Sequence, residues 1–250
     1  MSREATRTMR RTMRVIRGWW ARWIAVACVA GTAACNGITG IGKFDVQESS
    51  VPATDLLALM DECEDNQVST EDLKNDYDEP NAPLDVPVCA VDGKAVYWHA
   101  GMTIACDGSS DPERCPPESP HTAILDSGGR PLDPIELPFI VVPNNRCDDP
   151  NQRAPFDHEK VDIRKGAAVA VIYKNRLVYG VFGDIGMCDS IGRASYAMAE
   201  ALGIDSGGVP SGVTYFVFRG PGAVVSPVED REAAMEVGDR LAGELVAGRP

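Results

Sequence analysis

The sequence predicts a mainly β protein with peripheral helices, built as a small barrel or a sandwich. Short runs rich in β-branched and aromatic residues recur from Cys89 onward, and such runs are typical of strands. Gly and Pro cluster between them at 107–120 and 144–155, which is typical of the turns that join short strands. Because these short runs outnumber the helical segments, the pattern favours a barrel or sandwich over an α/β sheet.

The first 34 residues have the pattern of a secretion signal. Seven arginines and one glutamate precede the apolar run Trp23–Ala34, which matches the charged and apolar regions of such a signal. This run is shorter than the about 20 residues that a membrane-spanning helix needs. The small residues before Cys35 resemble a bacterial lipidation site, with threonine where leucine is more usual. Two alternatives are open, a lipid anchor on Cys35 and plain cleavage.

The rest of the chain is expected to form one domain behind a tether. Residues 35–53 have the composition of a tether, and residues 54–250 are long enough for a domain with its own core. A short amphipathic helix is predicted for Thr54–Asp65, with Thr54 as its cap. The acidic segment Asn66–Pro87 is predicted to be a loop, because its prolines interrupt regular structure.

Seven strands are expected after this loop. The predicted ranges are Ala95–Trp98, Met102–Cys106, Thr122–Leu125, Leu137–Val142, Ala167–Tyr173, Leu177–Phe182 and Val213–Phe218. Lys174-Asn175-Arg176 is predicted to close a hairpin. The sixth run is expected to end in Gly183-Asp184, so that Asp184 lies at a strand end, where catalytic groups are often presented.

Two helices are predicted in the second half of the chain. The first begins near Ser190 and ends at Gly203, where glycine suits the left-handed conformation that follows a helix. The second covers Glu229–Val246. Its apolar stripe is predicted to be Ala234, Val237, Leu241 and Leu245.

Six cysteines remain besides Cys28 and Cys35 of the signal region, and an even number in an exported chain predicts disulfides. They are Cys63, Cys89, Cys106, Cys115, Cys147 and Cys188. The short loop between Cys106 and Cys115 predicts that these two are bridged, whereas the other pairings stay open. No Cys-x-x-Cys pair occurs and the three histidines show no metal spacing, so no metal and no other cofactor is expected.

The charge balance excludes one class of partner. The chain carries a net charge of −13, and its first 34 residues hold seven arginines and one glutamate, so residues 35–250 carry −19. Nucleic-acid binding depends on Lys and Arg that neutralise phosphates, so no nucleic acid is expected as a partner. An acidic surface attracts a polycationic polymer, although composition alone favours the alternative that acidity keeps a secreted protein soluble.

Several segments, taken in order, resemble the glycoside hydrolase family 75 chitosanases, which cut glucosamine polymers. They are Tyr97-Trp98, Met102–Gly108, Leu137–Pro143, Phe156-Asp157, Tyr179–Asp184, Ile191–Ser195 and Gly208–Tyr215. The resemblance runs from about Val96 to Phe218. Within it, the order strand, Gly-Asp loop, helix, strand resembles the double-psi β-barrel, so a small double-psi-like β-barrel is expected.

The resemblance implies a catalytic pair of which one member is replaced. The family has an Asp after Phe-Gly, matched here by Asp184, and a Glu in Ile-Gly-Glu-Ala-Ser, whose position holds Arg193. Glycoside hydrolysis needs one carboxylic acid to protonate the leaving oxygen and one carboxylate to activate water or attack the sugar. Arginine stays protonated and cannot exchange a proton. Without the resemblance, Asp184 would be interpreted as a turn former.

Other carboxylates could serve the same site. Glu200 and Asp189 are considered as substitutes for the missing Glu, and Arg193 is expected to pair with Asp184 or Asp189. Asp107 and Asp157 match family positions and are expected, with Asp189, to line a sugar-binding cleft. The alternative for a loop aspartate is a turn.

The resemblance implies an exported protein that acts on β-1,4-glucosamine polymers by endo-hydrolysis, with Asp184 as the surviving catalytic carboxylate. The alternative is a non-catalytic glycan-binding or structural envelope lipoprotein. A chitosan-type polysaccharide is the expected partner, and the protein is expected to be a monomer that touches a membrane only through its lipid anchor. It is expected in a bacterial cell envelope or secreted.

Overall fold

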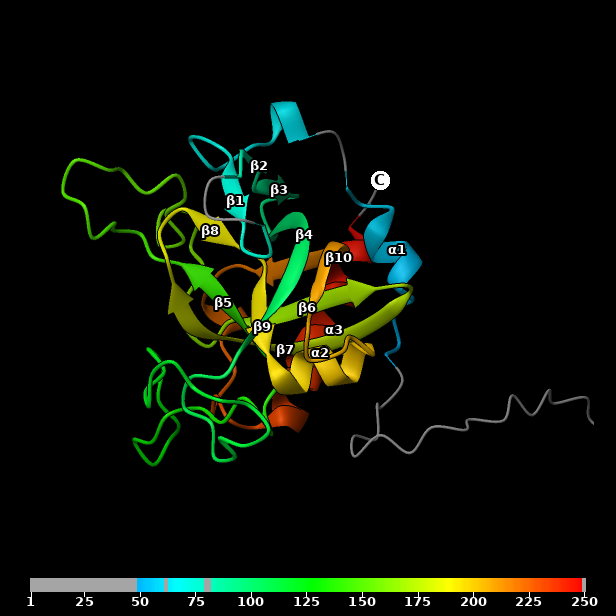
Figure 1. Cartoon of the computed structure of the whole chain (residues 1–250). Coiled ribbons are helices and arrows are strands. Elements are labelled where there is room, and N and C mark those ends of the chain that lie inside the picture. The colour runs from blue at the N-terminus through cyan, green and yellow to red at the C-terminus, as the bar shows by residue number, and fades with distance from the viewer. Residues whose placement is uncertain (1–48, 61–62, 79–81, 249–250) are drawn as a thin grey trace, which may run out of the picture. The chain divides into compact units, whose positions relative to one another are not determined.

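The centre of the fold is a closed barrel of six strands (Figure 1). This computed structural model describes residues 49–60, 63–78 and 82–248. The barrel strands are β4 (Ala95–Ala105), β5 (Phe139–Pro143), β6 (Ala168–Tyr173), β7 (Arg176–Gly186), β9 (Arg193–Ser195) and β10 (Val209–Phe218). They follow the order β10-β6-β7-β5-β9-β4, and pairing of β4 with β10 closes the ring. The predicted signal, Cys35 and most of the predicted tether lie outside the described residues.

The barrel mixes parallel and antiparallel pairs. The pairs β4–β9 and β5–β7 are parallel, and the other four are antiparallel. Around the barrel lie the helices α1 (Ala53–Leu57), α2 (Tyr196–Leu202) and α3 (Arg231–Ala247). The prediction of a mainly β fold, with a small barrel and peripheral helices, is therefore confirmed.

Buried aromatic side chains form part of the hydrophobic core. Trp98 of β4 and Tyr215 of β10 are register partners, and their rings stack with centroids 5.2 Å apart. Both side chains are almost fully buried. Burial of large apolar side chains is the main term that stabilises such a core.

The predicted hairpin is confirmed. Tyr173 pairs with Arg176, which leaves Lys174 and Asn175 as a two-residue turn between β6 and β7. Both turn residues have positive φ, 47° and 63°, as the hairpin turn that matches strand twist requires.

The predicted helix from Ser190 to Gly203 is wrong over its first half. Ser190–Ile191 is the short strand β8, Arg193–Ser195 is β9, and α2 begins only at Tyr196. Gly192 has a φ of 105° and a Cβ there would come within 3.0 Å of Ala100, so the chain passes close to β4 at this point. Pairing of β9 with two neighbouring strands overrides the local helical pattern. The predicted left-handed end at Gly203 is confirmed, with φ of 74°.

Several other ranges also differ from the predictions. β4 is one strand where two were predicted, and Thr122–Leu125 forms only an isolated bridge from Leu125 to Pro131. The predicted loop Asn66–Pro87 contains β1 (Leu73–Asn75) and β2 (Leu84–Val86), which form a second sheet with β8. Non-local pairing creates these short strands, and local sequence signals do not reveal it.

The predicted helix Thr54–Asp65 is shorter than expected. α1 ends at Leu57 and has Pro52 at its N-cap, and Cys63–Asp65 forms a separate 3₁₀ turn, η1. The hydroxyl of Thr54 donates to the Asp55 carboxylate instead of capping the helix. The strand β3 (Cys89–Val91) joins the edge of the main sheet at β4, and the 3₁₀ turn η2 (Pro221–Ala223) precedes α3.

The C-terminal helix α3 covers the outer face of β6 and β7. Asp230 caps it by accepting the N–H of Ala233 at 3.0 Å. A Cβ at Gly238 would come within 2.6 Å of the Tyr179 ring, so glycine permits close packing. Its buried residues are Ala234, Gly238, Ala242 and Leu245, whereas Val237 and Leu241 of the predicted stripe are only partly buried.

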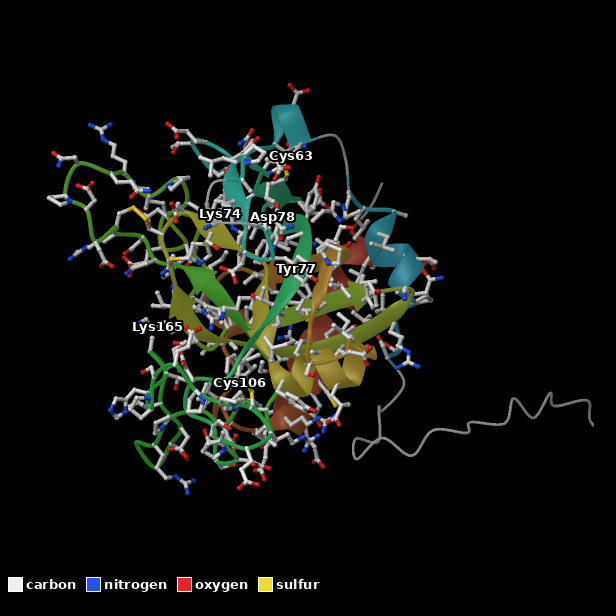
Figure 2. The ribbon with its side chains drawn as sticks, viewed as in Figure 1. Cys63, Lys74, Tyr77, Asp78, Cys106 and Lys165 are labelled. Atoms are coloured by element: carbon white, nitrogen blue, oxygen red, sulfur yellow. A yellow bond between two sulfur atoms is a disulfide. The ribbon has the colours of Figure 1, made fainter. Side chains whose placement is uncertain are left out.

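All six cysteines among the described residues are bridged. The predicted Cys106–Cys115 bridge is present, together with Cys63–Cys89 and Cys147–Cys188. Cys63 lies beside β3, and Cys106 lies at the far end of β4 (Figure 2). No helix in the described ranges is both long enough and apolar enough to cross a membrane.

Candidate active site

Asp184 and Arg193 lie on one face of the barrel, two strands apart. Arg193 of β9 pairs with Thr103 of β4 and with Val141 of β5. Val141 in turn pairs with Asp184 of β7. Register partners project to the same side of a sheet, and neighbouring strands are about 4.8 Å apart. The two Cα atoms are therefore roughly 10 Å apart. We call Thr103, Arg193, Val141 and Asp184 the cross-strand row.

A bulge at Gly183 turns Asp184 toward this face. Phe182 pairs with Ile140 and Asp184 pairs with Val141, so Gly183 is an extra residue on β7. Regular alternation would place Asp184 on the same face as Phe182, and the extra residue reverses this. The predicted strand end at Gly183-Asp184 is wrong, because pairing with β5 continues to Gly186.

The carboxyl group of Asp184 is buried and hydrogen-bonded. Its exposed fraction is 6%. The Oδ1 atom accepts the N–H of Ala123 at 2.6 Å and the N–H of Ile185 at 2.9 Å. Burial, and to a smaller extent the charge of Asp107, raise the pKa of Asp184, while the two N–H groups and Arg193 act in the opposite direction. The raised pKa keeps Asp184 protonated to higher pH than an exposed aspartate, as a proton donor requires.

The segment 106–123 holds Asp107 near Asp184. Asp107 Oδ1 accepts the N–H of Ser119 at 2.7 Å, and the N–H of Gly108 donates to the Ser119 carbonyl at 3.1 Å. The Cys106–Cys115 bridge closes the first part of this segment. The same segment therefore supplies a second carboxylate and a backbone donor to Asp184.

Arg193 pairs with a residue that sequence reasoning missed. Its Nη2 atom lies 3.4 Å from Oε2 of Glu118, and its side chain is 25% exposed. The predicted pairing with Asp184 or Asp189 is therefore wrong. The Nε atom of Arg193 is buried and has no hydrogen-bond partner among the described residues. Glu118 carries no sequence signal for this role, because it lies in a loop 75 residues upstream.

The substitutes predicted for the missing Glu lie elsewhere. Glu200 forms an ion pair with Arg114 at 2.7 Å, and the Arg114 guanidinium lies over the Tyr196 ring. Asp189 accepts a hydrogen bond from Gln152 at 3.1 Å. Neither residue belongs to the cross-strand row.

Asp157 has the contacts of a turn residue. It accepts the N–H groups of Glu159 and Lys160 and forms an ion pair with the Lys160 side chain at 3.2 Å. The structure shows no contact between Asp157 and the cross-strand row among the interactions of this residue. The turn alternative accounts for all of these contacts.

Asp76 is an acidic neighbour of the row that the sequence did not reveal. Its two carboxylate oxygens accept hydrogen bonds from the hydroxyls of Thr103 and Ser190. It directly follows β1, in a segment predicted to be a loop. No group of three His, Cys, Asp or Glu side chains in the described part of the chain is arranged to hold a metal ion.

Comparison with known proteins identifies related sequences. The family model described as fungal chitosanase of glycosyl hydrolase group 75 matches residues 102–241, more than half of the chain. An endo-chitosanase of Aspergillus oryzae (strain ATCC 42149 / RIB 40) is 26% identical over 87% of this chain and 99% of its own length. Endo-chitosanase C of Aspergillus oryzae is 28% identical over 62% of this chain, which spans only 41% of that relative.

One solved structure is also similar. The Streptomyces papain inhibitor (SPI) is 17% identical over 53% of this chain and 99% of the inhibitor, with a TM-score of 0.29.

Asp184 and Arg193 both lie inside the segment matched by the family model, whereas Asp76 lies outside it.

Proposed function

The chain belongs to glycosyl hydrolase group 75, the group of the fungal chitosanases, and from this membership we propose that it is an exported glycoside hydrolase that cleaves β-1,4-glucosamine polymers internally. One observation carries the proposal. Asp184, which the family resemblance puts at the position of a catalytic residue, is a buried carboxyl group whose pKa is raised. Such a group can deliver a proton to a glycosidic oxygen.

The proposed reaction uses two carboxyl groups. Asp184 gives its proton to the leaving oxygen as the bond between this oxygen and the anomeric carbon breaks. A water molecule forms the new bond to the anomeric carbon and loses a proton to a carboxylate. Arg193 cannot accept this proton. We assign the accepting role to Asp107, because it is the carboxylate whose charge raises the pKa of Asp184.

Export is part of the proposal. Three disulfides suit an oxidising compartment, and the first 34 residues have the pattern of a secretion signal. We infer a location in a bacterial cell envelope through a lipid on Cys35, or secretion after plain cleavage. Growth with a radioactive fatty acid distinguishes the two, since only the lipidated form becomes labelled.

The test of the activity is the release of reducing ends from chitosan by the purified protein, together with the fall in viscosity that internal cleavage causes. Asp184→Asn is expected to lower the rate by about 10²-fold or more. The control is Asp85→Asn, which changes an exposed carboxylate on β2. Equal rates for Asp184→Asn and the wild type would exclude the assigned role of Asp184.

Arg193 favours a second candidate function, a non-catalytic protein that binds such a glycan. This candidate predicts that the wild type is inert on chitosan but is retarded by chitosan in affinity electrophoresis. It also predicts that Arg193→Glu, which restores the family residue, creates measurable hydrolysis. If Arg193→Glu is inert and neither protein binds chitosan, both functions are wrong and a structural role remains.

A further inference from the structure

Not every N–H donor of the Arg193 guanidinium has a hydrogen-bond acceptor among the described residues. The guanidinium projects from the same row of residues as Asp184, two strands away. Its Nε–H group has no hydrogen-bond partner among the described residues. A charged donor left unpaired in a partly buried position is costly. The edge of the guanidinium formed by Nε and Nη2 therefore lacks an acceptor at the buried Nε–H group, and a ligand with two oxygens would supply one.

Glu118 occupies only part of this edge. Its Oε2 atom is 3.4 Å from Nη2, which is long for a charge-assisted hydrogen bond. Its side chain is 78% exposed, so solvent weakens the pair. Glu118 belongs to the segment 106–123, which also contains Asp107 and donates a backbone N–H to Asp184. A carboxylate of a ligand can displace the Glu118 carboxylate from Arg193 with a small loss of free energy, because the exposed Glu118 side chain is then hydrated by water.

Charges of opposite sign flank Arg193 on both sides. Asp76 is fixed beside the row by its hydrogen bond from Thr103, which is the register partner of Arg193 on β4. On the other side, Asp184 and Asp107 lie near each other. A polymer that carries ammonium groups alone would place a cation against Arg193. A polymer that carries both ammonium and carboxylate groups would match the sequence of charges.

Tyr77 adds an apolar surface at the Asp76 end. It directly follows Asp76 in the sequence, and its side chain, labelled in Figure 2, is 38% exposed. Its ring lies against Gly208, since a Cβ atom added to that glycine would be 3.4 Å from the Tyr77 Cε2 atom. An exposed ring with a polar tip is suited to binding a ligand that is partly apolar and partly polar, as a sugar is.

We propose that Arg193 binds a carboxylate carried by the glycan, so that the ligand of this chain is an amino-sugar polymer bearing both ammonium and carboxylate groups. The amino-sugar part rests on the proposed function. The carboxylate part rests on Arg193 itself. Its source is either a carboxyalkyl ether on the amino sugar or a uronic acid in the chain, and both offer the two oxygens that a guanidinium binds. Glu118 takes the place of this carboxylate when no ligand is bound.

The negative charge of the whole molecule does not prevent this binding. Residues 35–250 carry a net charge of −19, but charges farther away than about 8 Å are largely screened at physiological salt. A partly buried guanidinium with a fork of donors acts at short range. The overall charge therefore affects the rate at which the polymer associates, whereas Arg193 determines which polymer is bound more tightly.

The test is a binding measurement by isothermal titration calorimetry on the full chain with three polymers of matched length. They are chitosan, O-carboxymethyl chitosan, and an alternating polymer of glucuronic acid and glucosamine with a free amino group. Wild type is expected to bind at least one carboxylated polymer about 10-fold or more tightly than chitosan. The reason is that chitosan has no carboxylate to form charge-assisted hydrogen bonds with Arg193. The carboxylated polymer that binds identifies the source of the carboxylate.

Three variants separate the proposed role from a structural one. Arg193→Gln is expected to lose the preference for the carboxylated polymer while keeping its affinity for chitosan. Glu118→Gln is expected to bind the carboxylated polymer several-fold more tightly, because the competing carboxylate is gone. Arg146→Gln, at an exposed arginine of another loop, is the matched control and should behave as wild type.

The outcomes also separate this inference from the proposed function. Equal affinity of wild type for all three polymers, or a preference that persists in Arg193→Gln, overturns the carboxylate site but leaves hydrolysis of chitosan standing. Tight binding of a carboxylated polymer without cleavage of any polymer overturns the hydrolase and supports the site. Absence of binding and cleavage overturns both.

Discussion

At the scale of single residues, Asp184 combines burial with two hydrogen bonds from backbone N–H groups. Burial is the larger influence, so the pKa of Asp184 is raised. The folded protein therefore binds this proton more tightly than the unfolded chain does. The resulting stability is complete below the ordinary pKa of 3.8 and is lost as the pH rises through the raised value. An ionised Asp184 at neutral pH thus destabilises the fold that positions it.

The variant Asp184→Asn is expected to be more stable than the wild type at neutral pH. The amide removes the charge and keeps an oxygen that can accept the N–H groups of Ala123 and Ile185. The difference should disappear below pH 3.8, where the wild-type residue is protonated in both states. Urea unfolding at pH 3.5 and at pH 7.5 measures this. A lower unfolding midpoint for Asp184→Asn at pH 7.5 would contradict the cause assigned to the pKa shift.

The variant Asp107→Asn is expected to lower the pKa of Asp184. The negative charge of Asp107 is one of the influences that raise this pKa, and the amide removes that charge while an oxygen can still accept the Ser119 N–H. Carboxyl ¹³C NMR titration of Asp184 reports the change directly. The matched control is Asp157→Asn, whose contacts are confined to its own turn. An unchanged titration in Asp107→Asn would remove Asp107 from the proposed site.

At the scale of elements, the turn from β9 into α2 depends on Ser195. The buried Ser195 hydroxyl accepts the N–H of Phe139 at 2.9 Å and the N–H of Met198 at 3.2 Å. It also donates to the carbonyl of Leu137 at 2.8 Å. One hydroxyl thus caps α2 and ties it to the start of β5, which carries Val141 of the cross-strand row.

The variant Ser195→Ala is expected to lower the free energy of unfolding by about 2–3 kcal/mol, because it removes a cap and leaves two buried backbone groups unpaired. Denaturant unfolding measures the loss, with the exposed Ser206→Ala as control. A loss below about 0.5 kcal/mol would show that the backbone groups find other partners.

The elements that the sequence predicted correctly are those with local causes. Two turn residues with positive φ define the β6–β7 hairpin, and a glycine in the left-handed region ends α2. β9 was predicted as helix because its three residues form a strand only between two partners that are distant in sequence. β1 and β2 were missed for the same reason.

At the scale of the whole molecule, the site could be predicted only in part. The resemblance to a family led to the prediction of Asp184, Arg193 and Asp107 as site residues. The neighbours that define the environment of Arg193, Glu118 and Asp76, come from segments far away in sequence. Their roles depend on the closure of the barrel and on the path of loops across it, for which a single sequence holds no local signal.

The overall charge predicts opposite salt effects for the two kinds of polymer. The net charge of −19 on residues 35–250 attracts cationic chitosan over long range and repels a polymer with excess carboxylate. Raising NaCl from about 50 mM to about 500 mM should therefore slow association with chitosan and speed association with a strongly carboxylated polymer. Biolayer interferometry on the full chain measures both rates. The same direction of change for both polymers would show that long-range charge does not control arrival.

The bulge in β7 has a consequence for how this protein can vary. Gly183 has no charge and no side chain, yet a methyl group there would collide with Phe139 at 2.5 Å, and in a regular strand without the bulge Asp184 would lie on the same face as Phe182. A search restricted to ionisable groups would overlook Gly183 altogether. Mutational scans of this chain should consequently find positions that displace the carboxyl group of Asp184 without changing a single acid or base.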